Sequence, residues 1–386
     1  MKLVVFSHKV CWPSAASPIG HATDGGFVFH MQAMAGIFNV VNVVVPVDKP
    51  APNGEVPFTH TNISILPVAP IRQKGIYRKL YVPIWLIRHF GKFYNAIKNA
   101  DAVHAPIPGD IGTIGMLMAH AMGKPLFVRH CGNWMVAKTP AEKFWKWYMI
   151  KYAGGKRVFF ATGGGEAPPA LQNPNLEWIF SSSLSHQTLP ENAKRSVPGT
   201  HPELRLLIAC RQDEQKGTGR VIEALKLLPQ TMAISFTVIG EGNSLAQFKQ
   251  LAEQGKQNHR VKFLGKLSHK DVIAQMKTAD VFCYPTRASE GFPKVVLEAM
   301  SCGLTIMANP VSVLKTLIPS SQAGILLLND SAETIAEGIA DLYNNRKILQ
   351  TNAENGCHFA QQFSLEAWAN TIRNKMEQAW GRSTLD

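Results

Sequence analysis

The chain of 386 residues is long enough for two or three globular domains, and its 46% hydrophobic and 17% charged residues exclude a disordered polypeptide. No apolar run approaches the ~18 residues of a membrane span, and the strand-like start MKLVVFSHKV lacks the longer apolar core of a signal peptide. Six cysteines are scattered without a C-x-x-C pair, which favours a reducing, cytoplasmic compartment.

The formal net charge of +13 is concentrated in the first half of the chain. Residues 1–180 hold 18 Lys and Arg against 8 Asp and Glu, a surplus of 10, whereas the other 206 residues hold 22 against 19, a surplus of 3. We therefore expect the first half to face an anionic partner or surface.

Apolar, strand-like runs alternate with helix-like stretches from the first residue onward, which predicts parallel α/β domains. After the first run, KLVVFS, and a long loop, Gly25 and Gly26 open the helix-like stretch FVFHMQAMAG. Two glycines at a helix start let a ligand approach the backbone, although tight turns also use this pair.

Residues 71–100 carry seven Lys or Arg, no acid and six interleaved aromatic residues. This composition with helical spacing is typical of a helix at a membrane surface; it also fits an ordinary helix with a buried aromatic face. A second basic and aromatic stretch, EKFWKWYMIKYAGGKR, favours the membrane surface. Nucleic acid is the other possible anion, but no nucleic-acid-binding motif accompanies the pattern.

Two strand-like runs, DAVHAP and PLFVRH, carry His104 and His130 near their ends. Ligands of open α/β sheets bind at the carboxyl ends of the strands, so both histidines are candidates. The spacings of Cys11, His21 and His30 match no common zinc site. Three glycines at 163–165 lack the following G-K-[ST] of a P-loop and indicate a tight turn.

In the second half, the buried run LRLLIAC leads into Arg211, with Lys216 and a glycine five residues further on. Two cations held at a strand end can neutralise a diphosphate and the charge that grows on it as it leaves. Gly240 follows the next strand-like run in a G-E-G sequence that lacks the third glycine of a dinucleotide fingerprint.

The apolar run VFCYPT is followed by a loop with glycine and proline and then by a helix-like stretch, in the sequence EGFPKVVLE. The free N–H groups at such a helix start form an anion site. Glu290 lies at the mouth of the loop, and Glu298, eight positions later, lies roughly two turns along the helix.

The E-x7-E pattern with the following EAMSCG, together with R-x4-K-G, resembles the retaining glycosyltransferases of family GT4 (glycosyl transferases group 1), which have the GT-B fold. The resemblance implies two Rossmann-like domains whose parallel sheets face a cleft, with the last helix crossing back to the first domain. We expect an acceptor domain at 1–180 with a final helix at about 364–386, a linker at 181–203 and a donor domain at 204–363. Cys210 departs from the glycine that usually precedes the arginine.

The resemblance also implies site residues. Glu290 would hold the sugar hydroxyls, Glu298 the ribose, and His130 would lie near the anomeric centre, with Arg211 and Lys216 on the diphosphate. Backbone around Lys266 and Leu267 would hold the base. The catalytic residues would be His130, Arg211, Lys216 and Glu290, and the donor-binding residues would be Gly25, Gly26, Arg211, Lys216, Gly240, Lys266, Leu267, Glu290, Gly291, Phe292, Pro293, Lys294, Val295 and Glu298.

The expected activity is transfer of a hexose, with retention, from a nucleotide-diphosphate sugar to a glycan or lipid-linked oligosaccharide during polysaccharide biosynthesis. UDP-glucose is the favoured donor and GDP-mannose an alternative. No D-x-D sequence accompanies the site, so we expect neither a metal nor a cofactor, and we expect peripheral binding at the inner face of the membrane. A nucleotide-sugar epimerase and a catalytically silent partner subunit of the same fold are the other readings.

Overall fold

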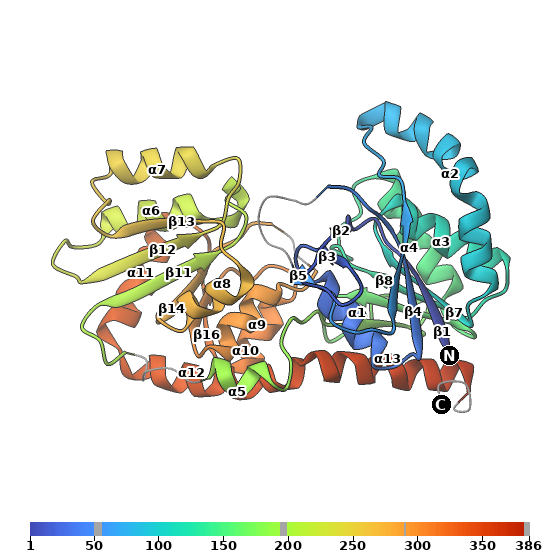
Figure 1. Cartoon of the computed structure of the whole chain (residues 1–386). Coiled ribbons are helices and arrows are strands. Elements are labelled where there is room, and N and C mark those ends of the chain that lie inside the picture. The colour runs from blue at the N-terminus through green and yellow to red at the C-terminus, as the bar shows by residue number, and fades with distance from the viewer. Residues whose placement is uncertain (50–55, 194–198, 289–290, 382–386) are drawn as a thin grey trace. The chain divides into compact units, whose positions relative to one another are not determined.

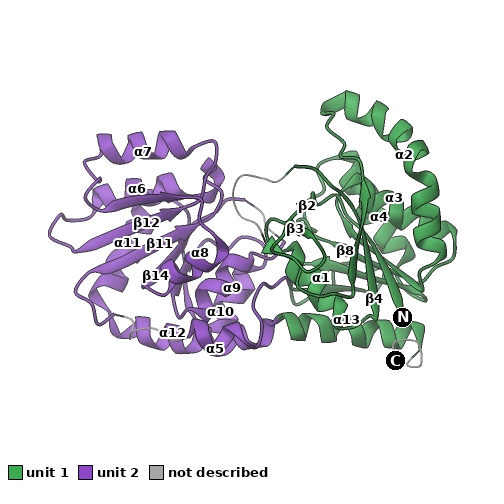
Figure 2. Ribbon diagram, viewed as in Figure 1, with its two compact units in different colours: residues 1–180, 365–386 green, residues 181–364 purple. Residues whose placement is uncertain are grey.

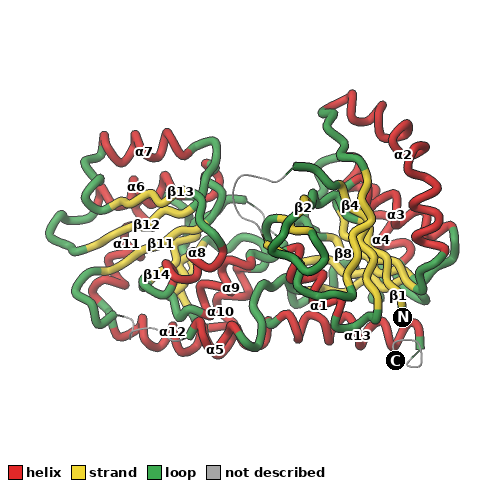
Figure 3. Tube along the Cα trace, in the orientation of Figure 1, coloured by secondary structure: helices red, strands yellow, loops and turns green. Residues whose placement is uncertain are grey.

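The computed structural model describes residues 1–49, 56–193, 199–288 and 291–381. The chain forms two compact units, shown in Figure 2: unit 1 contains residues 1–180 and 365–386, and unit 2 contains residues 181–364. Each unit is built around one parallel β-sheet (Figure 3). Both are Rossmann-like, as the sequence predicts.

The sheet of unit 1 has seven strands in the order β10-β9-β8-β7-β1-β4-β6, all parallel. Its central strands are apolar along nearly their whole length, because both faces of the sheet are covered by helices. The strands are β1 (Lys2–Phe6), β4 (Val40–Pro46), β6 (Ile63–Val68), β7 (Ala102–Ile107), β8 (Leu126–His130), β9 (Arg157–Thr162) and β10 (Leu176–Ile179).

Among the described residues, helices cover both faces of this sheet (Figure 1). One core cluster joins one face of the sheet to α2 (Gly75–Lys98), α3 (Asp110–Ala121) and α4 (Pro140–Tyr152). The opposite face packs against α1 (Phe27–Ala35) and the last helix, α13 (Leu365–Trp380). Because Trp368, Ile372 and Met376 are buried there, the chain returns to its first unit, as the GT-B resemblance implied.

The sheet of unit 2 has six strands in the order β13-β12-β11-β14-β15-β16. These strands are β11 (Leu204–Ala209), β12 (Ile234–Ile239), β13 (Val261–Gly265), β14 (Val281–Tyr284), β15 (Thr305–Ala308) and β16 (Gly324–Leu326). One face packs mainly against α8 (His269–Met276), α9 (Lys294–Ser301) and α10 (Leu314–Ser321), and the other against α6 (Thr218–Leu227), α7 (Leu245–Gln254) and α11 (Ala332–Asn344). Helix α12 (Lys347–Ala360) contributes to both clusters.

Several elements lie where the sequence pattern indicated loops. A small antiparallel sheet joins β2 (Trp12–Pro13), β3 (His21–Thr23) and β5 (Val56–Pro57) inside unit 1. The polar stretch interpreted as a linker contains α5 (Thr188–Asn192), and its leucines 184 and 189 are buried in the core of unit 2. Short 3-10 turns form at Glu214–Lys216 and Gln361–Phe363.

Asp330 and Glu333 have the sequence spacing of a capping box, but they do not form one at the start of α11. The N-cap is Ser331, whose hydroxyl accepts a hydrogen bond from the N–H of Thr334. The carboxylate of Asp330 is instead paired with two arginines, Arg220 and Arg287. Two cations bind this carboxylate in preference to a backbone N–H.

Candidate donor-binding site

A hollow of about 360 Å³ lies at the carboxyl ends of three neighbouring strands of unit 2. Arg211 follows β11, Gly240 follows β12, and Lys266 follows β13. Because β13, β12 and β11 are adjacent and parallel, the residues after them meet at one edge of the sheet. The complete lining is Ala209, Cys210, Arg211, Ile239, Gly240, Glu241, Lys266, Leu267, His269, Val272, Val295 and Glu298. Six of the residues expected to bind the donor therefore share this hollow.

The floor of the hollow depends on Gly240. Its φ is +123°, and an added Cβ would lie 1.9 Å from the carbonyl oxygen of Cys210. Only glycine allows the ends of β11 and β12 to approach this closely.

Gln212, which the sequence patterns did not single out, holds the same two strand ends together through its side-chain amide. Its side-chain nitrogen donates to the carbonyl oxygens of Cys210 (3.0 Å) and Ile239 (2.9 Å), and its side-chain oxygen accepts from the Thr218 hydroxyl at 2.7 Å. This buried amide ties two strand ends to the start of α6. The sequence signal for this role was a glutamine directly after a buried strand. Its hydrogen-bond partners, however, depend on which strands are neighbours in the sheet.

The two expected diphosphate cations differ in their surroundings. The side chain of Arg211 is 74% exposed, and its Nε lies 3.4 Å from a carboxylate oxygen of Asp213. Lys216 belongs to the 3-10 turn, and its ammonium lies 5.9 Å from the ring centre of Tyr284. Arg211 lines the hollow, whereas Lys216 does not.

The glycine that follows Lys216 is required by the packing of the turn. Gly217 has φ +96°, and a Cβ there would lie 2.5 Å from the carbonyl oxygen of Pro285. The K-G pair thus holds the lysine-bearing turn against the end of β14.

Glu298 lies on α9, is only 7% exposed and reaches the hollow. Its Oε1 accepts hydrogen bonds from the Ser183 hydroxyl and from His269 Nε2, the latter at 2.9 Å. Burial raises the pKa of Glu298, but the hydrogen bonds and charge of its neighbours outweigh burial and hold the pKa below its usual value. The hydrogen bond to Glu298 raises the pKa of His269, against the opposing effect of burial. An ionised carboxylate can accept hydrogen bonds from ligand hydroxyls.

Ser183 and His269 were missed by sequence reasoning. Ser183 stands in a run of three serines, and His269 begins α8 directly after the N-cap Ser268. They are 115 and 29 residues from Glu298 along the chain, so no local spacing connects them to it.

Glu290, the other acid of the E-x7-E pattern, lies outside the described residues. The residues after it lead directly into α9, whose N-cap is Pro293. Phe292 packs on Phe363 with ring centres 5.8 Å apart. Gly291, Lys294 and Val295 are half-buried, so the helix start expected to bind an anion is present at the edge of unit 2.

The segment that enters this loop is fixed by hydrogen bonds. The N–H of Arg287 donates to the carbonyl of Gln215 at 2.8 Å, and the Asn309 amide donates to the carbonyl of Thr286 at 3.2 Å. The guanidinium of Arg287 pairs with Asp330. These contacts connect the start of the loop to the turn that carries Lys216.

The candidate residues of unit 1 lie at strand and helix ends. Gly25 has φ +68° and Gly26 is the N-cap of α1. His130 is the last residue of β8, is buried, and packs edge-on against Trp134 with ring centres 5.4 Å apart. Burial lowers the pKa of His130 to about 4, so its imidazole is neutral at pH 7.

His104 is a core residue. Its Nδ1 donates to the carbonyl of Phe127 at 3.1 Å, its ring stacks on Phe127, and burial lowers its pKa to about 3. Within the described ranges, no three His, Cys, Asp or Glu side chains are grouped to hold a metal ion.

Two Rossmann-like units, with a hollow lined by Arg211 and Lys266 at the strand ends of the second, are the architecture of GT-B proteins. Residues 191–374 match the family model "Glycosyl transferases group 1". The matched residues are a little under half of the chain, and over them the chain is similar to the group 1 glycosyltransferases, the family that its motifs resemble.

Curated relatives agree with the family. An uncharacterized glycosyltransferase of Methanocaldococcus jannaschii is 28% identical over 42% of this chain and 45% of its own length, so the chain spans less than half of that relative. A GDP-mannose-dependent monoacylated α-(1-6)-phosphatidylinositol monomannoside mannosyltransferase of Corynebacterium glutamicum is 26% identical over 74% of this chain and 84% of its own length.

Solved structures share the fold. A glycosyltransferase from Rickettsia africae has a TM-score of 0.69 at 15% identity, covering 98% of both chains. Anabaena HepE in complex with UDP and glucose has a TM-score of 0.68 at 16% identity, covering 98% of this chain and 99% of its own. At such identities the likeness establishes the fold alone.

Proposed function

We propose that this protein transfers a hexose from a nucleotide-diphosphate sugar to a glycan or lipid-linked glycan acceptor, with retention of configuration. The observation that carries the proposal is the hollow of unit 2, where Arg211, the backbone after β12 and β13, and the ionised Glu298 line one space. A cation for the diphosphate and a carboxylate for ribose hydroxyls are the groups that such a donor requires.

The proposed mechanism uses fixed charges in place of a protein nucleophile. Arg211, Lys216 and the N-terminus of α9 would stabilise the negative charge that grows on the departing diphosphate. Because these cations would neutralise the diphosphate, we also propose that the transfer needs no metal ion. The acceptor hydroxyl would attack from the face that the leaving group departs, and a donor phosphate oxygen would take its proton. Neutral His130 would hydrogen-bond the sugar near the anomeric carbon.

Two donors deserve the first tests. UDP-glucose follows from the family resemblance of the motifs. GDP-mannose is supported by the corynebacterial relative, whose name states that donor. Backbone contacts around Lys266 and Leu267 would hold either base, because they present N–H and C=O groups rather than a base-specific side chain.

We also propose that unit 1 binds an anionic membrane surface, at the inner face of the membrane, through α2. This helix buries Trp85, Phe93 and Ile97 in the core and exposes a second apolar face that includes Tyr77 (74% exposed) and Ile87 (78%). The helix therefore has the buried aromatic face of an ordinary helix, and its exposed apolar face supports the membrane-surface proposal. Exposed apolar residues with interleaved lysine and arginine suit the lipid–water boundary. Along the described residues, no helix is long and apolar enough to cross a membrane.

Calorimetric titration of the full chain with UDP-glucose and GDP-mannose tests the transferase proposal. Binding of one of them, with release of the nucleoside diphosphate when a lipid-linked glycan fraction is added, is the expected result. An absence of binding by both of them and by UDP, GDP and ADP would overturn the proposal.

A further inference from the structure

A second hollow lies on the outer surface of unit 1, along α4. It encloses about 440 Å³ and is lined by Ala137, Lys143, Lys146, Trp147, Ile150, Lys151 and Gln172. Five of these residues belong to the basic and aromatic stretch EKFWKWYMIKYAGGKR, to which the proposed transfer reaction gives no role. Its size is within the range of small-ligand sites.

The charge in this hollow is positive and is not balanced by nearby acids. Three lysines line it, and no ion pair joins any of them to a carboxylate within the described part of the chain. The single acid of α4, Glu142, accepts hydrogen bonds from the backbone N–H groups of Lys138 and Thr139, at 2.8 Å each, and so caps the helix. The ammonium of Lys146 donates to the carbonyl of Trp134 at 3.4 Å, a neutral group that does not cancel its charge. An anion entering the hollow would therefore meet ammonium groups that no carboxylate pairs with.

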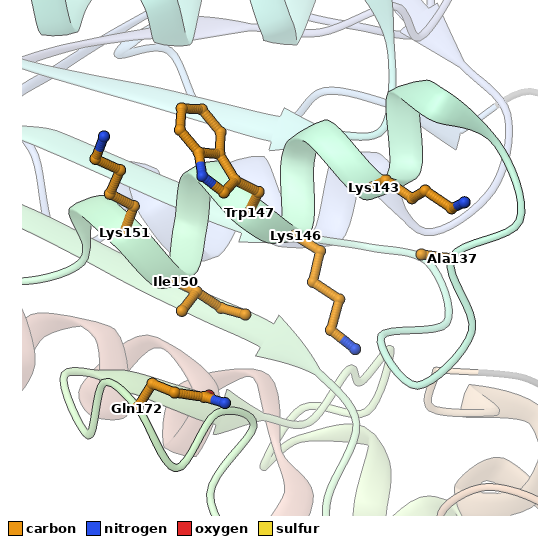
Figure 4. Close-up of a pocket in the computed structure, with 7 residues that line it drawn as sticks. All are labelled: Ala137, Lys143, Lys146, Trp147, Ile150, Lys151 and Gln172. Atoms are coloured by element: carbon orange, nitrogen blue, oxygen red, sulfur yellow. The ribbon is translucent and has the colours of Figure 1, made fainter.

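Between the three lysines, the hollow is lined by apolar and aromatic side chains. Figure 4 shows Trp147 and Lys151 extending from one side of α4 and Ile150 and Lys146 from the other, with Gln172 on a separate segment. Trp147 is 50% exposed, and the ammonium of Lys151 lies 5.1 Å from its ring centre. Indole rings and lysine stems with exposed ammonium groups are the side chains that proteins place where an apolar layer meets water.

The residues beside the hollow add exposed apolar side chains to it. Met135 and Val136 precede Ala137, Leu171 precedes Gln172, and all three apolar side chains are exposed. Tyr148 and Met149 of α4 pack in the same core cluster as Trp85 and Phe93 of α2, so both helices cover the same face of the sheet. The hollow thus belongs to the same side of unit 1 as the exposed apolar face of α2.

We propose that this hollow binds the phosphate-bearing headgroup of an anionic lipid. Lys143 and Lys146 would contact the phosphate, while Trp147 and the apolar residues beside the hollow would reach the boundary of the acyl chains. The proposal rests on the proposed membrane binding of unit 1 and deepens it, because it adds a defined headgroup site to the general attraction of α2 for an anionic surface.

Vesicle sedimentation of the full chain tests the site. Phosphatidylcholine vesicles with and without phosphatidylglycerol are compared for wild type, Lys143→Ala/Lys146→Ala and the charge-matched control Lys249→Ala/Lys262→Ala, whose lysines are exposed on unit 2. We expect retention on the anionic vesicles to fall roughly tenfold or more in the first variant and to change little in the control. Equal losses in both variants, or no retention of wild type, would overturn the proposal.

Two further measurements test the depth of Trp147 in the membrane and distinguish a lipid headgroup from a free anion. Phosphatidylglycerol with brominated acyl chains should quench part of the tryptophan fluorescence of wild type. The Trp147→Phe variant should show less quenching, because Trp147 is the residue placed at the acyl-chain boundary. Identical quenching in the two proteins would refute that position of Trp147. If free inorganic phosphate protects Lys143 and Lys146 from acylation as well as the anionic vesicles do, the site is one for a soluble anion and the lipid proposal is wrong.

Donor binding distinguishes this proposal from the proposed reaction. Calorimetry with UDP-glucose and GDP-mannose is expected to give unchanged affinity for Lys143→Ala/Lys146→Ala, because neither lysine lines the donor hollow or is assigned to the donor. The wild type could bind neither donor and yet lose its retention on anionic vesicles when both lysines are replaced. That result would overturn the proposed transfer reaction and support the lipid site.

Discussion

Glu298 and His269 are joined by a 2.9 Å hydrogen bond between Oε1 and Nε2, at the edge of the hollow in unit 2. The carboxylate comes from a buried position on α9, whereas the imidazole is 40% exposed at the start of α8. The pair therefore joins two helices and presents a charged group to the ligand space at the same time.

The first prediction concerns the pH dependence of stability. The folded state raises the pKa of His269 above its ordinary 6.5, so the stability from its protonated form is complete below pH 6.5 and is lost as pH rises through the folded pKa. The folded state lowers the pKa of Glu298 below 4.5, so its contribution is complete above pH 4.5 and is lost as pH falls through the folded pKa. We expect the pair to stabilise the fold most between pH 4.5 and 6.5.

Urea unfolding at pH 6 and at pH 8.5 measures this effect on the alkaline side. The free energy of unfolding of wild type should fall more between the two conditions than that of His269→Gln, which retains a side-chain donor but does not titrate. Parallel changes in the two proteins would contradict the assignment of the pKa shift to this pair.

The second prediction concerns Lys216. Replacement by alanine should cost about 1.5–3 kcal/mol of donor binding, the usual range for a charged hydrogen bond. The loss should appear in titrations with the nucleoside diphosphate and be absent with the nucleoside, because only the former carries the charge. Lys249→Ala is the control, and an equal loss for nucleoside and diphosphate would remove the assigned role.

The third prediction concerns the close approach of β11 and β12. Gly240→Ala should destabilise unit 2 by about 2–4 kcal/mol, because the new methyl group would meet the Cys210 carbonyl at a backbone conformation that alanine avoids. Gly265→Ala is the matched control: its φ is also positive, at +67°, but nothing lies within 4 Å of the added carbon. It should cost only about 1–2 kcal/mol. Thermal unfolding compares the two, and similar losses would argue against the clash.

The fourth prediction concerns the exposed apolar face of α2. Tyr77→Ser/Ile87→Ser should reduce retention on phosphatidylglycerol vesicles, with little change in thermal stability, because both side chains are exposed in the folded unit. Retention of wild type should also fall with added salt, since screening weakens the attraction to anionic lipid. Leu328→Ser, at a 92% exposed position of unit 2, is the control. Undiminished binding of the α2 variant would show that this helix is not the membrane contact.

Local patterns were sufficient for most of the strands and helices. Runs such as VVNVVVP and LRLLIA are buried on both faces, and this burial is the reason that they are apolar without alternation. The short strands β2, β3 and β5 were missed because two or three residues carry too little periodicity to be distinguished from loop. The spacing of Asp330 and Glu333 suggests a helix cap, whereas the two arginine partners of Asp330 are remote in the sequence and leave no local signal.

The sequence alone predicts that Arg211, Gly240 and Lys266 follow strands, because a strand-like run ends just before each of them. It also determined the loop and helix that carry Glu298. That these positions meet follows from the folded sheet, since the order β13-β12-β11 is a property of the whole sheet. The same holds for the pairing of Glu298 with Ser183 and His269: such contacts join distant segments, and their energies depend on burial and geometry that no local spacing records.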